Sequence, residues 1–265
     1  MRKIIVLICT VLLLGMALFA ADKKDSRVLT VGATPQPHAE LLKLIADDLA
    51  AQGITLKVVE FTDYVLPNEA LESGQLDANF LQHLPYLQAI NRERKYHLVS
   101  AGGIHIEPLA LYSRKVKSLA ELKSGAVIAI PNDPTNEGRA LLLLQAAGLL
   151  TLDARAGLTA TPLDIKTNPR KLKFREIEAA SLPRVLADVD AAVINGNYAL
   201  AAGLSAARDG LTVEGAQSPY VNIVAVKSGN EKRPEIMALV KALQSARVKE
   251  YIASRYPDGE VVAVF

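Results

Sequence analysis

The sequence predicts an α/β protein with two lobes, in which helices flank parallel-rich sheets. Short apolar strands alternate with helical stretches along almost the whole chain of 265 residues, and this alternation favours parallel sheets covered by helices. Half of the residues are hydrophobic and 22% are charged, so the chain can bury a large core. Two apolar crossover strands, within Ile106–Ser113 and Ser218–Val226, are expected to join the lobes. The first lobe then comprises residues 27–111 and 220–265, and the second comprises residues 112–219.

Each element is predicted from the local pattern of residues. Strands are expected where short runs are apolar or rich in β-branched residues and lie between turn residues, at Val28–Ala33, Leu56–Phe61, Asp77–Leu81, Leu98–Ala101, Ala126–Ile130, Lys173–Ile177, Ala191–Ile194 and Ile223–Val226. Helices are expected where apolar residues recur at helical spacing, from Pro37 to Gly53, near Tyr86–Lys95, and at Asn136–Ala147, Pro234–Leu243 and Val248–Tyr256. Ser118 and Glu121 form a capping box that is expected to open a short helix.

Residues 1–21 are expected to be a targeting segment. Arg2 and Lys3 precede an uncharged apolar run that continues to Ala21, which is the pattern of an export signal. The run is close to the ~17–25 residues that span a membrane, so the segment is either cleaved or retained as an anchor. Cys9 lies in the middle of the run, directly after Ile8, and is interpreted as an apolar position rather than an acylation site.

Composition and motifs exclude several classes of function. Lys and Arg number 30 and Asp and Glu number 28, giving a net charge of +2, which is too balanced for a nucleic-acid-binding surface. The single cysteine excludes an internal disulfide framework and a cysteine-ligated metal centre. The four histidines (His38, His83, His97 and His105) are scattered without metal-ligand spacing, and dinucleotide, phosphate-loop and nucleophile-elbow motifs are missing. We therefore expect no metal and no cofactor.

The segment NDPTNEGR, residues 132–139, is the first candidate for ligand binding. It follows the strand Ala126–Ile130 and runs into a helix that Thr135 or Asn136 can cap. The free N–H groups of the first helical turn, together with Arg139, form a natural receptor for a small anion such as a carboxylate. The alternative interpretation is an ordinary helix cap followed by a solvated arginine.

Polar side chains near the ends of other strands are further candidates. Asn195 follows a strand, where its amide can serve a ligand as donor and acceptor or simply form a turn. Asn222 lies in the second predicted crossover, and a buried amide in an apolar strand needs a partner. That partner is either a ligand or a neighbouring strand.

A group of rings within residues 61–86 provides an apolar candidate. It forms either a slot for the side chain of a ligand or a local hydrophobic core. Its members are Phe61, Tyr64, Phe80, His83 and Tyr86.

Five strings along the chain resemble one known family. They are GATPQPHAE (32–40), FTDYVLPNEAL (61–71), LDANFLQHLPYL (76–87), AIPNDPTNEGRALLLLQAAGLL (129–150) and SPYVNIVAV (218–226). They are similar to the methionine-binding lipoproteins, which are the substrate-binding proteins of methionine ABC importers. The resemblance implies a type II-like periplasmic-binding-protein fold that closes over methionine or a related amino acid. It also implies a monomer that delivers this ligand to a membrane permease and ATPase, without catalysis.

The resemblance implies roles for individual residues as well. The residue matching Arg139 grips the ligand carboxylate, and asparagines matching Asn195 and Asn222 hold its polar end. Rings enclose the thioether, because polarizable sulfur packs well against aromatic groups. The ligand-binding residues predicted in this way and from the patterns above are Tyr64, Phe80, Leu81, His83, Tyr86, Asn136, Arg139, Asn195 and Asn222.

This chain departs from the family at two points. The family usually has an aromatic residue at the position of Leu81, and Phe80 cannot replace it because adjacent strand residues point to opposite faces. The slot is then wider, and its ligand is methionine, a similar amino acid or a small peptide. The lipobox cysteine is also missing, so we expect a periplasmic protein that is either free or held by its signal segment.

Two other classes of function remain open from the sequence. An enzyme on the same scaffold, acting on a small carboxylic acid, would need an acid/base pair in the cleft. Asp133 and Glu137 are the carboxylates near the candidate anion loop, although Glu137 is also favoured by the dipole at the start of a helix. A sensor or adhesion protein could keep the fold without transport.

Overall fold

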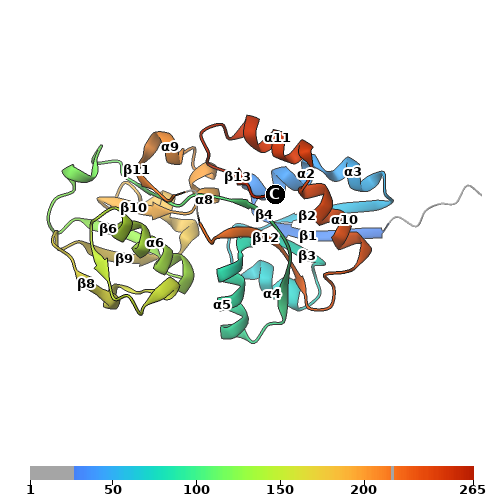
Figure 1. Cartoon of the computed structure of the whole chain (residues 1–265), viewed down its shortest axis with the longest axis horizontal. Helices are drawn as coiled ribbons and strands as arrows, with labels where there is room; N and C mark the ends of the chain where they lie inside the picture. Colours follow the sequence, from blue (N-terminus) through green and yellow to red (C-terminus); the bar gives the residue numbers. More distant parts are fainter. Residues whose placement is uncertain (1–26, 216–217) are drawn as a thin grey trace, which may run out of the picture.

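The computed structural model describes residues 27–215 and 218–265, which form two α/β lobes side by side (Figure 1). The predicted α/β class with two lobes is confirmed. The predicted targeting segment at residues 1–21 lies outside the described residues. None of the helices within the described residues is long and apolar enough to cross a membrane.

A six-stranded mixed sheet forms the lobe on the right of Figure 1. Its strands are β1 (Arg27–Ala33), β2 (Ile54–Glu60), β3 (Ala78–His83), β4 (Leu98–Ile106), β12 (Val221–Lys227) and β13 (Val262–Ala263), in the order β13-β4-β12-β3-β1-β2. β1 is parallel to β2 and β3, whereas β12 is antiparallel to both β3 and β4. The insertion of β12 between β3 and β4 makes this lobe from two separate stretches of the chain.

Helices cover both faces of this sheet. They are η1 (Pro35–Ala39), α2 (Glu40–Leu44), α3 (Ala46–Ala50), α4 (Leu66–Glu72), α5 (Leu84–Arg94), α10 (Pro234–Leu243) and α11 (Ala246–Arg255). Val224 of β12 belongs to the same core cluster as Leu239 of α10, whereas its neighbour Ile223 clusters with Leu71 of α4 and Leu87 of α5. Successive strand residues thus serve opposite faces, with α2, α3 and α11 on one side and α4 and α5 on the other (Figure 1).

A five-stranded sheet forms the second lobe. Its strands are β5 (Ala110–Tyr112), β6 (Val127–Pro131), β9 (Lys173–Ile177), β10 (Ala191–Ile194) and β11 (Gly210–Val213), in the order β11-β5-β10-β6-β9. β6 is parallel to β9 and β10, and β5 is antiparallel to β10 and β11. The remaining elements are a ribbon of β7 (Thr151–Leu152) and β8 (Ile165–Thr167), the helices α6 (Pro134–Ala146), α7 (Leu182–Val185), α8 (Gly196–Ala201) and α9 (Ala206–Asp209), and the short turns η2 (Leu119–Glu121), η3 (Gly157–Thr159), η4 (Pro162–Asp164) and η5 (Ala179–Ser181).

The chain passes between the sheets twice, between β4 and β5 and between β11 and β12. The first passage corrects the predicted continuous strand Ile106–Ser113. β4 ends at Ile106 and β5 begins at Ala110, because Pro108 has no N–H to donate to a sheet. The helix predicted at Ser118 is also shorter than expected, since η2 is a single 3₁₀ turn.

Candidate ligand-binding site

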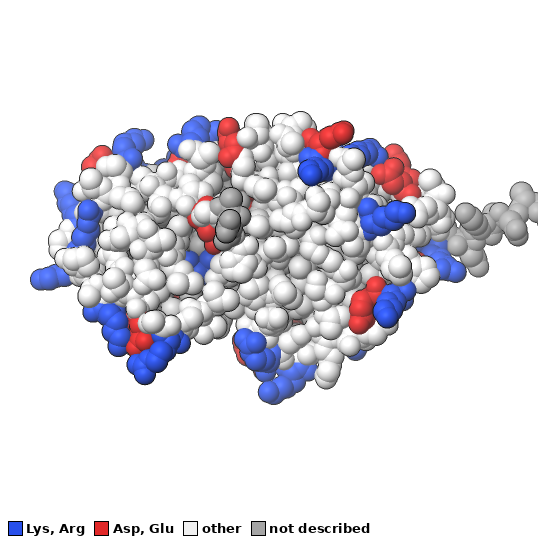
Figure 2. Space-filling model, viewed as in Figure 1, with Lys and Arg blue, Asp and Glu red and all other residues white. Residues whose placement is uncertain are grey.

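A small pocket lies between the lobes. The surface is indented at the lower edge between the two lobes, and charged side chains on this face lie mainly at the periphery (Figure 2). The pocket is lined by Tyr64, Leu81, Gln82, His83, Tyr86 and Asn222 from the first lobe, by Asn136, Arg139, Asn195, Gly196 and Asn197 from the second, and by Glu107 from the first passage.

The structure brings together all of the sequence-predicted site residues except Phe80. Phe80 is fully buried and does not line the pocket. Its ring lies 4.6 Å from the ring of His38 and 5.4 Å from that of His105, measured between centroids. The assignment of Phe80 to the pocket is therefore corrected, because its ring packs in the core cluster of the first lobe that also contains Ile104 and Val224.

The loop that carries Asn136 and Arg139 is capped differently from the prediction. Asp133 is the N-cap of α6, and its Oδ1 accepts the backbone N–H of Asn136 at 3.0 Å. The prediction that Thr135 or Asn136 caps the helix is wrong, because Asp133 precedes Pro134 and so takes the extended conformation that an N-cap requires. Its carboxylate is then engaged in the cap and does not line the pocket.

Arg139 is buried and tightly engaged. Its Nε donates to Oε1 of Glu214 at 3.0 Å, and its Nη2 donates to the other oxygen of Glu214 and to the backbone oxygen of Glu107 at 2.8 Å. The guanidinium also lies 4.3 Å from the ring centre of Tyr220. These contacts exclude the alternative of a solvated arginine. Among the described residues Nη1 has no hydrogen-bond partner, so it remains as a donor for an anion in the pocket.

A chain of side-chain hydrogen bonds joins the two lobes beside the pocket. Asn136 donates to the Asp133 carboxylate, so its Oδ1 accepts from Asn195 at 2.8 Å and from Nε2 of His83 at 3.2 Å. Nδ1 of His83 accepts the backbone N–H of Tyr86. Burial and then the charge of Arg139 lower the pKa of His83 to about 3, so this ring is neutral. Within the described part of the chain, Oδ1 of Asn195 is buried without a partner.

Three of the rings predicted for the slot, those of Tyr64, His83 and Tyr86, meet at the pocket, whereas Phe61 and Phe80 pack in the hydrophobic core of the first lobe. The hydroxyl of Tyr64 donates to Oδ1 of Asn197 in the other lobe at 2.5 Å, and that of Tyr86 donates to the backbone oxygen of Tyr64 at 3.2 Å. Tyr198 of α8 joins them, with its ring centre 4.9 Å from that of Tyr64. Its hydroxyl contacts the backbone oxygen of Thr62 in the first lobe. The two lobes are thus in contact across the pocket.

Glu107 is the main pocket residue that the sequence interpretation missed. Its carboxyl is buried, and this burial raises its pKa, against the opposing influence of His38, Arg139 and a backbone hydrogen bond from Asn197. Gly196 lies so close that an added Cβ would come within 2.7 Å of the Cβ of Glu107. The signal in the sequence was a carboxylate inside an otherwise apolar crossover stretch.

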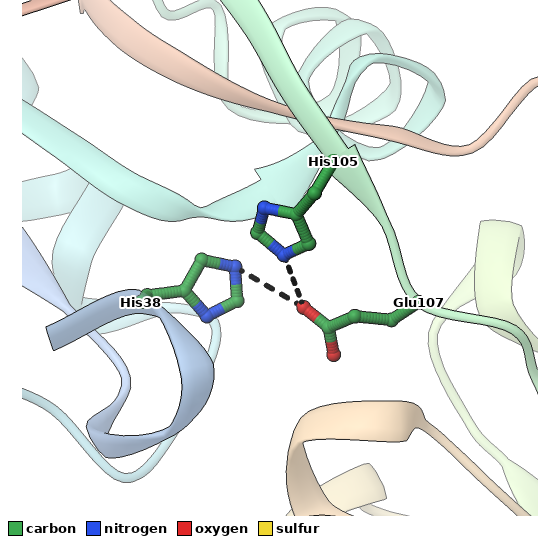
Figure 3. A group of neighbouring side chains, drawn as sticks. All are labelled: His38, His105 and Glu107. Carbon is green, nitrogen blue, oxygen red and sulfur yellow. Dashed lines mark hydrogen bonds and ion pairs between the residues drawn. The ribbon is translucent and has the colours of Figure 1, made fainter. Parts of the chain in front are cut away.

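Two histidines that were interpreted as scattered meet behind Glu107. The ligand atoms of His38, His105 and Glu107 all lie within 4.8 Å of one another (Figure 3). Two imidazoles and a carboxylate are a donor set that zinc accepts. In this structure, however, Nε2 of His105 hydrogen-bonds the Glu107 carboxylate directly at 2.8 Å.

Two α/β lobes, linked by two passages and in contact across a buried polar pocket, define a two-lobed substrate-binding protein. The model of the NlpA lipoprotein family matches residues 29–265. The chain belongs to this family.

Relatives at 44–49% identity cover most of the chain. Membrane lipoprotein TpN32 of Treponema pallidum is 47% identical, over 94% of this chain and 92% of its own. The D-methionine-binding lipoprotein MetQ of Escherichia coli is 44% identical, over 91% and 90%. A nutrient-binding protein from Burkholderia cenocepacia, whose structure was solved bound to methionine, is 49% identical, over 89% of this chain and 100% of its own, with a TM-score of 0.86.

Proposed function

We propose that this protein captures methionine or a methionine-like amino acid and delivers it to the permease and ATPase of an ABC importer. The observation that carries the proposal is a guanidinium and a carboxyl group at one end of the pocket between the lobes. Arg139 and Glu107 both line this pocket, and the charge of Arg139 acts on the Glu107 carboxyl, opposing the rise in its pKa. An α-amino acid carries its carboxylate and its ammonium on a single carbon, and this arrangement suits both groups.

The rest of the pocket suits an uncharged side chain. Among the described lining residues, Arg139 and Glu107 are the only ones with a guanidinium or carboxyl group, and His83 is neutral because its pKa is lowered to about 3. The hydroxyls of Tyr64 and Tyr86 are engaged with protein atoms, which leaves ring surface and Leu81 for an apolar group. A thioether packs favourably against such surfaces.

The pocket supports binding rather than catalysis. Asp133 and Glu137, the acid/base pair that an enzyme would have needed, do not line the pocket. Asp133 caps α6. The pKa of Glu137 is raised to about 7, mainly by burial and secondly by neighbouring carboxylates.

In this proposal, one lobe is formed by residues 27–111 with 220–265 and the other by residues 112–219. The two lobes close over the ligand by a hinge motion at their two connections. We further propose that the protein is exported and acts as a monomer.

Calorimetry with L-methionine, D-methionine and other amino acids tests the proposal. We expect methionine to bind, and Arg139→Ala to weaken this binding by about 2–5 kcal/mol, because the ligand carboxylate loses its buried partner. Arg139→Ala also leaves the Glu214 carboxylate without its ion-pair partner. Glu214→Gln breaks the same ion pair but keeps the guanidinium, so it is the matched control and should keep most of the affinity. If the wild-type protein binds no amino acid, the proposed function is wrong. Unchanged affinity in Arg139→Ala would remove the role assigned to the guanidinium.

A further inference from the structure

Two buried histidines behind the pocket face one carboxylate oxygen, and one of them, His105, hydrogen-bonds it. Figure 3 shows His38 from η1, His105 from β4 and Glu107 just beyond β4, with both rings facing the same oxygen and the second oxygen pointing away from them. Nε2 of His105 lies 2.8 Å from Oε1 of Glu107, and Nε2 of His38 lies 3.3 Å from it. Glu107 lines the pocket, whereas the two histidines do not.

The hydrogen-bond partners assign the tautomer of each ring. Nδ1 of His105 is buried without a partner among the described residues. A lone pair is cheaper to leave unpaired there than an N–H, so the proton belongs on Nε2, where it faces the carboxylate. In His38, Nε2 faces Oε1 of Glu107 and Oδ1 of Asn222, both acceptors, while Nδ1 lies 2.7 Å from the hydroxyl of Thr34. The proton of His38 is therefore also on Nε2, and Thr34 donates to Nδ1.

His105 donates to Glu107 and His38 donates to Asn222, and neither ring adds positive charge. Burial lowers the pKa of His38 to about 4 and that of His105 to about 3. The other groups that act on Glu107 are the backbone N–H of Asn197, Arg139, which is paired with Glu214, and Tyr64, whose hydroxyl is engaged with Asn197. Burial raises the pKa of Glu107, and hydrogen bonds from neutral donors oppose this rise by favouring the ionised carboxyl. Such donors add no positive charge that would compete with a cation in the pocket.

We propose that His38 and His105 are positioning residues that hold Glu107 ionised and oriented as the receptor for the ammonium group of the ligand. This inference rests on the proposed function, because it requires the ligand to be an amino acid. His38 has a second target, since its hydrogen bond to Asn222 orients another pocket residue. Two scattered histidines thereby become part of the selectivity for α-amino acids over simple acids.

The experiment compares two ligands that differ only in the amino group. They are L-methionine and 4-(methylsulfanyl)butanoate, which is methionine without its ammonium. We expect His105→Leu to weaken methionine binding at least tenfold while affinity for the des-amino acid, measured by competition where it is weak, changes less than twofold. His105→Gln, which keeps an N–H donor, should recover most of the methionine affinity, and His97→Leu, a change at an exposed histidine, should have no effect. Equal losses for both ligands, or an unchanged methionine affinity in His105→Leu, would overturn the proposal.

A second readout requires no ligand. We expect the pKa of the Glu107 carboxyl, followed by carbon-13 NMR titration, to rise by at least one unit in His105→Leu and to return toward the wild-type value in His105→Gln. His38→Gln provides a second variant if His105→Leu does not fold, and it should preserve the pKa of Glu107. An unaltered pKa in His105→Leu would contradict the positioning role. This measurement separates failure of the inference from failure of the proposed function, because it is made without any amino acid.

Discussion

Several polar side chains around the pocket use most of their hydrogen bonds on the protein and keep one atom free. In Arg139, Nε and Nη2 donate hydrogen bonds to protein oxygens, whereas Nη1 has no partner among the described residues. Asn195 donates to Asn136 while its own Oδ1 is unpaired within the described chain. A side chain anchored in this way cannot rotate to bring its unpaired atom to another protein hydrogen-bond partner. Its free donor or acceptor is therefore pre-organised for a ligand.

Leu81 offers the most direct test of ligand preference at a single position. It lines the pocket, at the position where the resemblance to the methionine-binding lipoproteins implies an aromatic residue. We expect Leu81→Phe to tighten methionine binding by about 1 kcal/mol, roughly fivefold, because sulfur packs favourably against a ring. Isothermal titration calorimetry checks this, with norleucine as the ligand that lacks sulfur. Weaker methionine binding in Leu81→Phe would show that the slot has no room for the larger ring.

At the scale of elements, α6 is positioned by a close backbone contact as well as by its N-cap. Gly138 precedes Arg139 and faces η3, where an added Cβ would lie 2.3 Å from the backbone oxygen of Leu158 and 2.9 Å from the backbone nitrogen of Ala160. Backbone atoms cannot move aside as a side-chain tip does. The glycine in the NEGR string therefore sets how closely α6 approaches η3, and with it the place of Arg139.

We expect Gly138→Ala to lower the free energy of unfolding by about 1–2 kcal/mol, although alanine is the better helix former. Overpacking costs about 1–3 kcal/mol, and a severe backbone clash belongs at the upper end, above the ~1 kcal/mol gained in helix propensity. Methionine affinity should fall as well, because Arg139 moves with the helix. Urea denaturation measures the first effect. Gly215→Ala is the control, since its added methyl meets no atom of the described residues within 4 Å. Equal stability of the two variants would contradict the contact.

At the scale of the whole molecule, buried neutral histidines make folding sensitive to acid. The pKa of His105 is lowered by burial to about 3, whereas an unfolded histidine titrates near ~6.5. Between these two pKa values, the imidazole is protonated in the unfolded chain but not in the folded chain. The free energy of unfolding therefore falls as the pH falls. Glu107 and Glu137 have raised pKa values in the folded protein, so their contribution to stability increases as the pH falls. A comparison of variants is therefore needed to isolate one histidine.

We expect the wild-type protein to lose stability relative to His105→Gln as the pH falls from 6.5 to 4, by up to about 1.4 kcal/mol per pH unit. Glutamine does not titrate, so the difference between the two unfolding free energies isolates the buried imidazole. Urea denaturation at half-unit intervals measures both profiles. Parallel profiles would show that His105 takes up its proton equally in the folded and unfolded states.

Local patterns and the resemblance to the family together predicted the elements and most of the pocket lining. Asn195 directly follows β10, and Arg139 lies in the helix that follows β6. Their roles in binding stay predictions. Phe80 was misplaced, because its ring packs in the core of the first lobe. The helix cap was misplaced by two or three residues, since several capping side chains adjoin one another and only the backbone path chooses between them.

The sequence by itself determined the α/β class and the neighbourhood of the guanidinium and amides, because apolar periodicity and strand ends are local properties. It indicated the family through the resemblance of five strings to known members. The tertiary structure alone decided that Arg139 pairs with Glu214, 75 positions away. It also placed His38 and His105 against Glu107 and the carboxyl of Glu107 in the pocket. These contacts join residues that no spacing relates, and the two passages of the chain between sheets bring them together.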